Sequence, residues 1–227
     1  MFKIIDCEQG SQEWFSARIG MFTGSTASDL HMGKTTKGYL GLIAEKAAET
    51  FFEVSSYEIE QDTGKQVYSD FKPSIGINGE YGTLMEPMAR EYYAKKYDEE
   101  IYTVGLCVSE RWPNDVITSP DALFTRKSGG VEIKCRRSLA THMTCLRLRT
   151  PSDFKEMNTK EYWQVIHNMV VCEAEQWDFV SYLPFLKPEH VMACLVVSRC
   201  DVMEDIESHT KEIEEAVRRK HVLLQQQ

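Results

Sequence analysis

Hydrophobic side chains recur with a helical period along the N-terminal part of the chain. Segments 11–19 and 25–31 predict two short helices, and segment 37–53 predicts a longer amphipathic helix. Residues 54–75 are polar and contain Gly and Pro, which is typical of a loop. Segment 78–97 predicts a second long helix. Its buried stripe is expected to consist of Tyr81, Leu84, Met85, Met88 and Tyr92.

The pattern then changes to short apolar, β-branched segments that are typical of strands. Strands are predicted at 101–108, 115–119, 130–135, 177–186 and 191–199. Further helices are predicted at 138–148, 159–174 and 202–222. This order of helices and strands predicts an α/β fold, a central mixed β-sheet flanked by helices, in a single domain over residues 1–227.

The composition is that of an ordinary globular protein, with 42% hydrophobic and 27% charged residues. No segment approaches the ~18 apolar residues of a membrane span. The N-terminus also lacks the apolar core of a signal peptide, so we expect a cytoplasmic protein with no membrane partner. The 7 cysteines include no C-x-x-C pair, which argues against a disulfide framework and against a zinc site.

The charge is unevenly distributed along the chain. The net charge is −9, whereas segment 126–155 contains eight cations and two anions and is therefore net +6. A local basic patch on an acidic body suits an anion bound at one place, such as a DNA phosphate. The alternative is a solvated loop face. Arg136 and Arg137 are the candidates for DNA binding that follow the strand at 130–135 most closely.

Two carboxylates and a lysine are predicted to converge near this segment. Asp121 follows a strand and a proline, and Glu132 and Lys134 alternate with apolar residues on the strand "GVEIKC". A hairpin between positions 121 and 132 would bring the two carboxylates together, with "GG" at 129–130 suited to its turn. Such a site could bind Mg²⁺ and hydrolyse a phosphodiester. The alternative is a Glu–Lys pair on the surface of an edge strand.

Two further polar residues lie on predicted helices. Glu86 lies beside the apolar stripe of helix 78–97 and could add a metal ligand, directly or through water; alternatively it faces solvent. Gln164 lies near the buried side of helix 159–174. A buried amide needs a hydrogen-bonding partner, which could be the attacking water, a phosphate or a neighbouring helix.

The chain resembles the lambda-exonuclease type of phage alkaline exonuclease, the YqaJ-like recombinase family of the PD-(D/E)xK nuclease superfamily. The likeness rests on five short segments in family order over about residues 12–171. These segments are "EWFSARIGMFTGSTAS", "NGEYGTLMEPMA", "SPDAL", "VEIKC" and "YWQVIHNMVV". One departure is Ile166, which stands where the family often has a second glutamine.

The resemblance implies a role for each matching residue. Asp121, Glu132 and the Ile133 carbonyl would bind Mg²⁺, with Mn²⁺ as a possible substitute and two ions per site. Lys134 would act on the attacking water. Glu86 would be an outer metal ligand, and Gln164 would support the water or the substrate. The same likeness implies that Arg18 and Ser25 hold a terminal phosphate, which suits a guanidinium and a hydroxyl at a helix start.

The resemblance also implies an activity and partners. A family member would degrade one strand of linear duplex DNA from the 5′ end and leave 3′ single strands for recombination. Its partners would be duplex DNA ends, copies of itself in a trimer and a single-strand annealing protein. Two alternatives remain open: a structure-specific or restriction-type endonuclease of the same superfamily, and a catalytically idle DNA-binding accessory of recombination.

Overall fold

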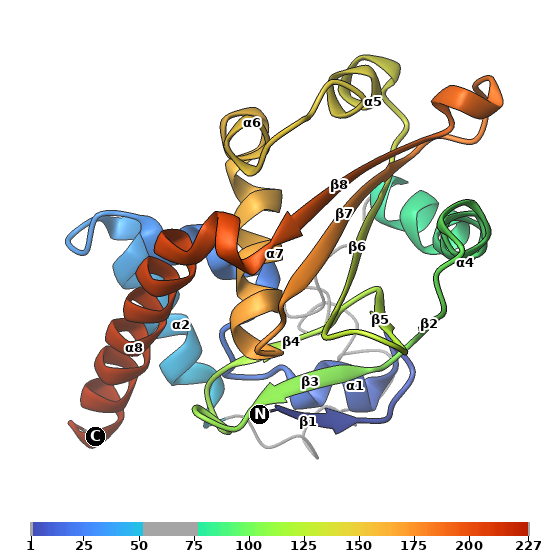
Figure 1. Ribbon diagram of the computed structural model, residues 1–227. Helices are drawn as coiled ribbons and strands as arrows, with labels where there is room; N and C mark the ends of the chain where they lie inside the picture. The colour runs from blue at the N-terminus through green and yellow to red at the C-terminus, as the bar shows by residue number, and fades with distance from the viewer. Residues whose placement is uncertain (1, 52–76, 227) are drawn as a thin grey trace.

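The computed structural model describes residues 2–51 and 77–226, which form two β-sheets and the helices around them (Figure 1). The larger sheet has the strand order β2 (Ile101–Tyr102), β5 (Ala122–Phe124), β6 (Gly129–Cys135), β7 (Gln176–Tyr182) and β8 (Met192–Ser198). β6 and β7 are parallel and the other pairs are antiparallel, so the predicted mixed sheet is confirmed. The smaller sheet is antiparallel and contains β1 (Phe2–Ile5), β3 (Leu106–Ser109) and β4 (Ile117–Thr118).

Two long helices pack on opposite faces of the larger sheet (Figure 1). α4 (Ile77–Tyr97) contacts the face that carries Val131 and Ile133, and α7 (Thr159–Val171) contacts the other face. Alternate residues of β6 point to opposite faces, so Glu132 and Lys134 are directed towards α7. The strand pattern "VEIKC" therefore separates the apolar residues from the charged ones, as the sequence predicts.

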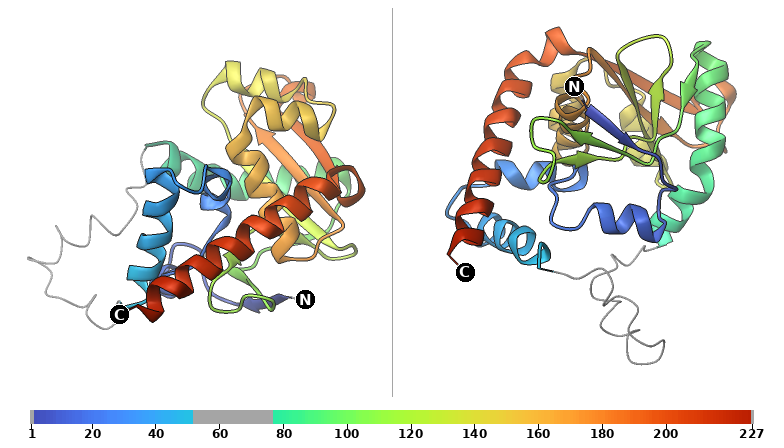
Figure 2. Two further views of the ribbon diagram at one scale, coloured as in Figure 1. Left: turned by 90° about the vertical axis from the view of Figure 1, so that its left-hand side faces the viewer. Right: turned by 90° about the horizontal axis from the view of Figure 1, so that it is seen from below.

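The other helices complete the fold. α5 (Leu139–Cys145) and α6 (Pro151–Met157) lie between β6 and α7 in the chain, and η4 (Arg199–Val202) leads from β8 into α8 (Met203–Gln225). α8 packs beside α2 (Lys37–Glu49) and η1 (Gly24–His31), as Figure 2 shows. α1 (Gln12–Ala17) and η3 (Pro188–His190) are short. None of the described helices combines the length and the apolar character that crossing a bilayer requires.

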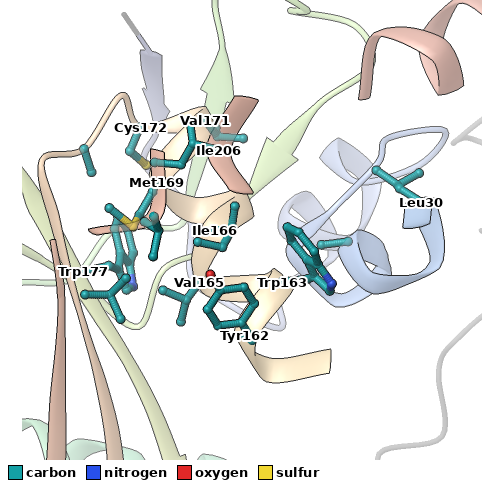
Figure 3. Packing of buried hydrophobic residues seen from close by; sticks show 14 of the residues in the cluster. Leu30, Tyr162, Trp163, Val165, Ile166, Met169, Val171, Cys172, Trp177 and Ile206 are labelled. Carbon is teal, nitrogen blue, oxygen red and sulfur yellow. The ribbon is translucent and has the colours of Figure 1, made fainter. Parts of the chain in front are cut away.

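The main core lies between α7 and the sheet. Tyr162, Val165, Ile166 and Met169 of α7 belong to this core together with Trp177 of β7, and all five residues are at most 1% exposed. Met169 lies beside Trp177 in Figure 3. Burial of these large side chains fixes the rotation of α7 about its axis. The polar side chains on the same helix then have fixed directions.

The structure corrects several of the predicted elements. The predicted strand at 101–108 is wrong as one element, because the chain changes sheets near Gly105: β2 pairs with β5, whereas β3 pairs with β1 and β4. β1, β5 and α6 were not predicted. The predicted strand 115–119 is reduced to the two residues of β4. The end of predicted helix 37–53 and the predicted loop 54–75 fall largely outside the described residues, and the single domain over 1–227 stays a prediction.

The buried stripe of α4 also differs from its prediction. Met85, Ala89 and Tyr93 are buried, whereas Leu84 is 73% exposed and Met88 is 53% exposed. The helix is rotated so that the line of residues spaced by four meets the apolar face of the sheet. α4 is apolar over a wide arc, so hydrophobicity alone does not determine which row of its residues packs against the sheet.

The hairpin predicted between positions 121 and 132 is present. β5 and β6 are antiparallel neighbours with Ala122 opposite Val131. Gly129 at the turn has a φ of +150°, and a Cβ atom at this position would lie 1.8 Å from the Gln176 carbonyl oxygen. Only glycine fits this close approach of β6 to β7. The hairpin places Asp121 immediately before β5 and beside the middle of β6.

A chain of three histidines connects η1, α8 and α7. The Nε2 atom of His167 donates to the Ile117 carbonyl at 3.1 Å, so its Nδ1 accepts from Nε2 of His209 at 3.1 Å. Nδ1 of His209 then accepts from Nε2 of His31 at 2.9 Å. This arrangement requires the rings of His167 and His209 to be neutral, because each accepts a hydrogen bond through Nδ1. Burial lowers the pKa of His31 and of His167 to about 4, and it also lowers that of His209.

We expect this histidine chain to make the fold less stable in mild acid. In the unfolded chain each ring titrates near ~6.5, whereas in the folded protein the pKa values are depressed. Stability is therefore fully present above about pH 6.5 and is lost as the pH falls towards about 4. The melting temperature, measured by circular dichroism, should drop between about pH 7 and about pH 5. In His31→Asn, which removes one titrating ring, the drop should be smaller; equal slopes would contradict the explanation.

Candidate functional site

Asp121, Glu132 and Lys134 come together on the face of β6 that points towards α7. Oδ2 of Asp121 accepts a hydrogen bond from the backbone N–H of Ile133 at 2.5 Å, which holds this carboxylate against the strand. Nζ of Lys134 donates to Oε1 of Glu132 at 2.6 Å. Glu132 is 1% exposed, whereas the Lys134 side chain keeps 26% of its surface in solvent. The site thus combines the buried carboxylate of Glu132, the partly buried carboxylate of Asp121 and the ammonium group of Lys134 at its opening.

α7 supports both charged residues of β6. Oε1 of Gln164 accepts from Nζ of Lys134 at 3.1 Å, so the amide predicted on the buried side of this helix contacts the site. Nδ2 of Asn168 donates to Oε2 of Glu132 at 3.0 Å. Sequence reasoning missed Asn168. The available signal was its position four residues after Gln164, which places both amides on the same face of the helix.

The electrostatics show an excess of negative charge at the site. Burial, together with Glu132 and Glu86, raises the pKa of Asp121 well above its usual value. Burial would lower the pKa of Lys134, but Glu132 and Asp121 outweigh it, so this pKa is raised. Lys134 is therefore an ammonium group that donates hydrogen bonds. One cation, Lys134, beside two carboxylates, Asp121 and Glu132, leaves the site short of positive charge.

A divalent cation fits this set of donors. Among the described residues, no three His, Cys, Asp or Glu side chains meet at metal-binding spacing. Mg²⁺ instead binds through one or two carboxylates and keeps several waters. Asp121 and Glu132, with the Ile133 carbonyl, supply hard oxygen atoms of this kind. The raised pKa of Asp121 shows that positive charge would be favourable there.

Glu86 lies within electrostatic range of the site but is not joined to it by a hydrogen bond. It forms an ion pair with Arg90, one turn further along α4. Burial raises its pKa in spite of Arg90, and Glu132 adds to this effect. Glu86 also lines a cavity of about 730 Å³ between α4 and the N-terminal segment. Its predicted role as an outer metal ligand stays a prediction.

Arg18 and Ser25 line a pocket of about 160 Å³ next to the site. Gln164 also lines this pocket, so this residue belongs both to the pocket and to the site of Lys134. The Arg18 guanidinium lies 4.0 Å from the Trp14 ring, and within the described part of the chain no carboxylate pairs with it. Burial lowers the pKa of Arg18 to about 10, so it remains a cation at neutral pH. Of the described residues that line the pocket, Arg18 alone is charged, which suits an anion.

Other side chains hold the segment between β4 and β5, which leads to Asp121. Nε1 of Trp14 donates to the Ser119 hydroxyl at 3.0 Å, and this hydroxyl donates to the Gly105 carbonyl at 2.9 Å. The Gln9 amide donates to the Pro120 carbonyl at 3.0 Å. Sequence reasoning had not assigned Gln9 or Ser119 to the site, because their contacts cross about a hundred positions of sequence.

The predicted basic patch is largely neutralised. Arg136 forms a bidentate ion pair with Glu161, with hydrogen bonds of 2.7 and 2.5 Å. Four other cations of segment 126–155 also have carboxylate partners: Arg126, Lys127, Lys134 and Lys155. Arg137 is exposed and lies 5.9 Å from the Tyr81 ring. Binding of DNA by Arg136 and Arg137 stays a prediction, and for Arg136 it would require competition with Glu161.

Gly24 lies where the pocket meets the site, close to two side chains of α7. A Cβ atom added to it would lie 3.2 Å from Cγ of Gln164 and 3.3 Å from Oδ1 of Asn168. We expect Gly24→Ala to displace these side chains, to cost about 1–3 kcal/mol of unfolding free energy and to lower any activity of the site at least ~10-fold. Gly41→Ala is the control, because its Cβ meets nothing within 4 Å in α2. It should stabilise the helix by about 1 kcal/mol. Urea unfolding of both variants measures the difference, and equal stabilities would contradict it.

Comparisons with known proteins bear on the family and the fold. The family described as YqaJ-like viral recombinase domain matches residues 13–175. Comparison with curated proteins gives no match. The fold is similar to that of the alkaline exonuclease LHK-Exo from Laribacter hongkongensis, with a TM-score of 0.69 and 24% identity over 95% of each chain. LHK-Exo in complex with dAMP gives 0.68 and 22%, also over 95% of each chain.

A more distant likeness is to a phage related exonuclease from Haemophilus somnus 129PT. Its TM-score is 0.57 at 11% identity, over 91% of this chain and 96% of that one. At these identities the solved structures establish the fold alone, which is the PD-(D/E)xK-like architecture that the sequence predicts.

Proposed function

Since the chain belongs to the YqaJ-like viral recombinase family, which supports a nuclease that acts on DNA, we propose that it is a divalent-metal-dependent exonuclease. In this proposal it degrades one strand of linear duplex DNA from the 5′ end and leaves 3′ single strands for recombination. The observation that carries the proposal is that the carboxylate–lysine site and the Arg18 pocket lie next to each other and have one residue in common. Gln164 touches Lys134 and also lines the pocket of Arg18 and Ser25.

The pocket supports action at a strand end. Its volume of about 160 Å³ suits a small anion such as a phosphate group. The Arg18 guanidinium would bind a terminal phosphate, and the exposed Ser25 hydroxyl, at the second position of η1, would donate to it. A phosphate held there would place the next phosphodiester bonds beside Asp121 and Glu132. An endonuclease has no need for such a pocket.

Each residue of the site has a separate role in the proposed reaction. Asp121, Glu132 and the Ile133 carbonyl would hold the metal, with Glu86 as an outer ligand, and we propose Mg²⁺, two ions per site, with Mn²⁺ as a substitute. When bound, the metal would polarise the scissile phosphate and acidify a water. The Lys134 ammonium would orient the attacking water and stabilise negative charge on the phosphate. Gln164 would keep Lys134 in place.

The proposal is tested with linear duplex DNA labelled separately at each 5′ and 3′ end, next to a closed circle. We expect Mg²⁺-dependent loss of the 5′ label, no loss in EDTA and an intact circle. A cut circle would indicate an endonuclease instead. Binding of DNA ends without cleavage under any metal would indicate an idle recombination accessory.

We also propose partners on the basis of the family resemblance. These are further copies of the chain in a trimer and a single-strand annealing protein. Light scattering after size exclusion measures the mass in solution. A monomeric mass at micromolar concentration would remove the trimer from the proposal without affecting the nuclease.

A further inference from the structure

The contacts of α7 with β6 follow from the topology of the chain. β6 and β7 are parallel, and α7 lies in the connection between them, so it runs antiparallel to β6. Gln164 and Asn168 are four positions apart on α7, or ~6 Å along its axis. Glu132 and Lys134 are two positions apart on β6, or ~6.6 Å. The two pairs therefore match in spacing, with Gln164 at Lys134 and Asn168 at Glu132.

The orientation of the Asn168 amide is fixed from both ends. Its Nδ2 donates to Oε2 of Glu132 at 3.0 Å, and its Oδ1 accepts from the Thr118 hydroxyl. Asn168, Thr118 and Glu132 are each at most 1% exposed. Since a carboxylate accepts but cannot donate, the amide presents its N–H to Glu132. The Thr118 hydroxyl donates to the other end of the amide and holds it in this orientation.

Because of this contact, the two carboxylate oxygens of Glu132 have different partners. Oε2 is held by Asn168, while Oε1 is directed towards Lys134 and the opening of the site. We propose that Asn168, oriented by Thr118, is a positioning residue that presents Oε1 of Glu132 to the metal. The inference rests on the proposed function, because it names how one ligand of the same site is held.

The chemistry of metal sites gives the expected size of the effect. A metal-binding carboxylate that is free to rotate must lose this freedom when the ion binds. Partners that orient ligands in this way typically change metal affinity by ~10–100-fold. A purely structural amide would instead change the stability of the fold and leave the affinity for metal unchanged.

The test compares Thr118→Val with Thr118→Ser. Valine has the shape of threonine but removes the hydroxyl, whereas serine keeps the hydroxyl. Binding of MnCl₂ to the DNA-free protein is measured by isothermal titration calorimetry, and the Mg²⁺ concentration for half-maximal cleavage is measured separately. We expect Thr118→Val to bind Mn²⁺ at least ~10-fold more weakly, and Thr118→Ser to restore binding. Asn168→Ala should show the larger loss if it folds.

Thr210→Val is the matched control, because it removes a hydroxyl that donates to the Ile206 carbonyl within α8. It should leave Mn²⁺ binding unchanged. If wild-type protein binds Mn²⁺ and cleaves DNA while Thr118→Val binds Mn²⁺ within ~2-fold of it, the positioning role is wrong and the nuclease stands. If wild-type protein neither binds Mn²⁺ nor cleaves, the proposed function itself fails.

Discussion

Replacement of Lys134 by alanine is expected to lower the cleavage rate by ~10³-fold while binding of DNA ends is retained. Nζ of Lys134 is the group at the opening of the site that can donate to a water or a phosphate oxygen. Its loss removes a stabilising charge from the reaction but leaves Arg18 and Ser25, which it does not contact, in the pocket. Single-turnover digestion of end-labelled duplex measures the rate, and fluorescence anisotropy in Ca²⁺ measures binding.

Lys127→Ala provides the control for this substitution. Lys127 lies on the same β5–β6 hairpin and is also ion-paired, with Glu99 at 2.6 Å, but it is outside the site. Its removal should change the rate less than ~3-fold, as for a surface pair. If Lys134→Ala cut DNA at the wild-type rate, Lys134 would have no part in the chemistry.

Asp121→Asn is expected to separate stability from activity. The asparagine keeps the size of the side chain, and its Oδ1 can accept from the Ile133 N–H as the carboxylate does. Under the proposed function, activity should fall by ~10²–10⁴-fold, because a charged metal ligand would be lost. In EDTA, however, the melting temperature should rise by a few degrees. The raised pKa of Asp121 means that burial, Glu132 and Glu86 disfavour its charged form in the fold.

Differential scanning fluorimetry with EDTA and with Mg²⁺ measures this effect. Mg²⁺ should stabilise the wild-type protein and have little effect on Asp121→Asn. The control is Asp201→Asn, which changes an exposed carboxylate in η4 and should alter neither quantity. A lower melting temperature of Asp121→Asn in EDTA would show that the carboxylate stabilises the metal-free fold.

The central motif could be predicted from the sequence because its geometry is local. The alternation of "VEIKC" determines which side chains of β6 face the core, and the glycines at 129–130 mark the hairpin that brings Asp121 to Glu132. Gln164 could be found for a similar reason, since a helical period places it near the buried side. These inferences need only the repeat of one strand or one helix.

Features that depend on distant pairing could not be predicted. Nothing in the sequence of segment 126–155 indicates that the Arg136 guanidinium forms two hydrogen bonds with Glu161, or that Lys155 pairs with Asp205. The division of residues 101–109 between two sheets is equally hidden, because Gly105 is only one small residue in an apolar segment. Asn168 was missed since its importance depends on Glu132 and Thr118, which come from two other strands.

The ion pairs along segment 126–155 have a consequence for the thermodynamics of DNA binding. A cation that already has a carboxylate partner gains little by contacting a phosphate and releases few counterions from the duplex. With five of the eight cations of this segment paired, the affinity of the segment for DNA should depend only weakly on ionic strength. Under the proposed function, non-specific attraction to the interior of a duplex would then be weak, and the Arg18 pocket would have to provide the discrimination between an end and the interior.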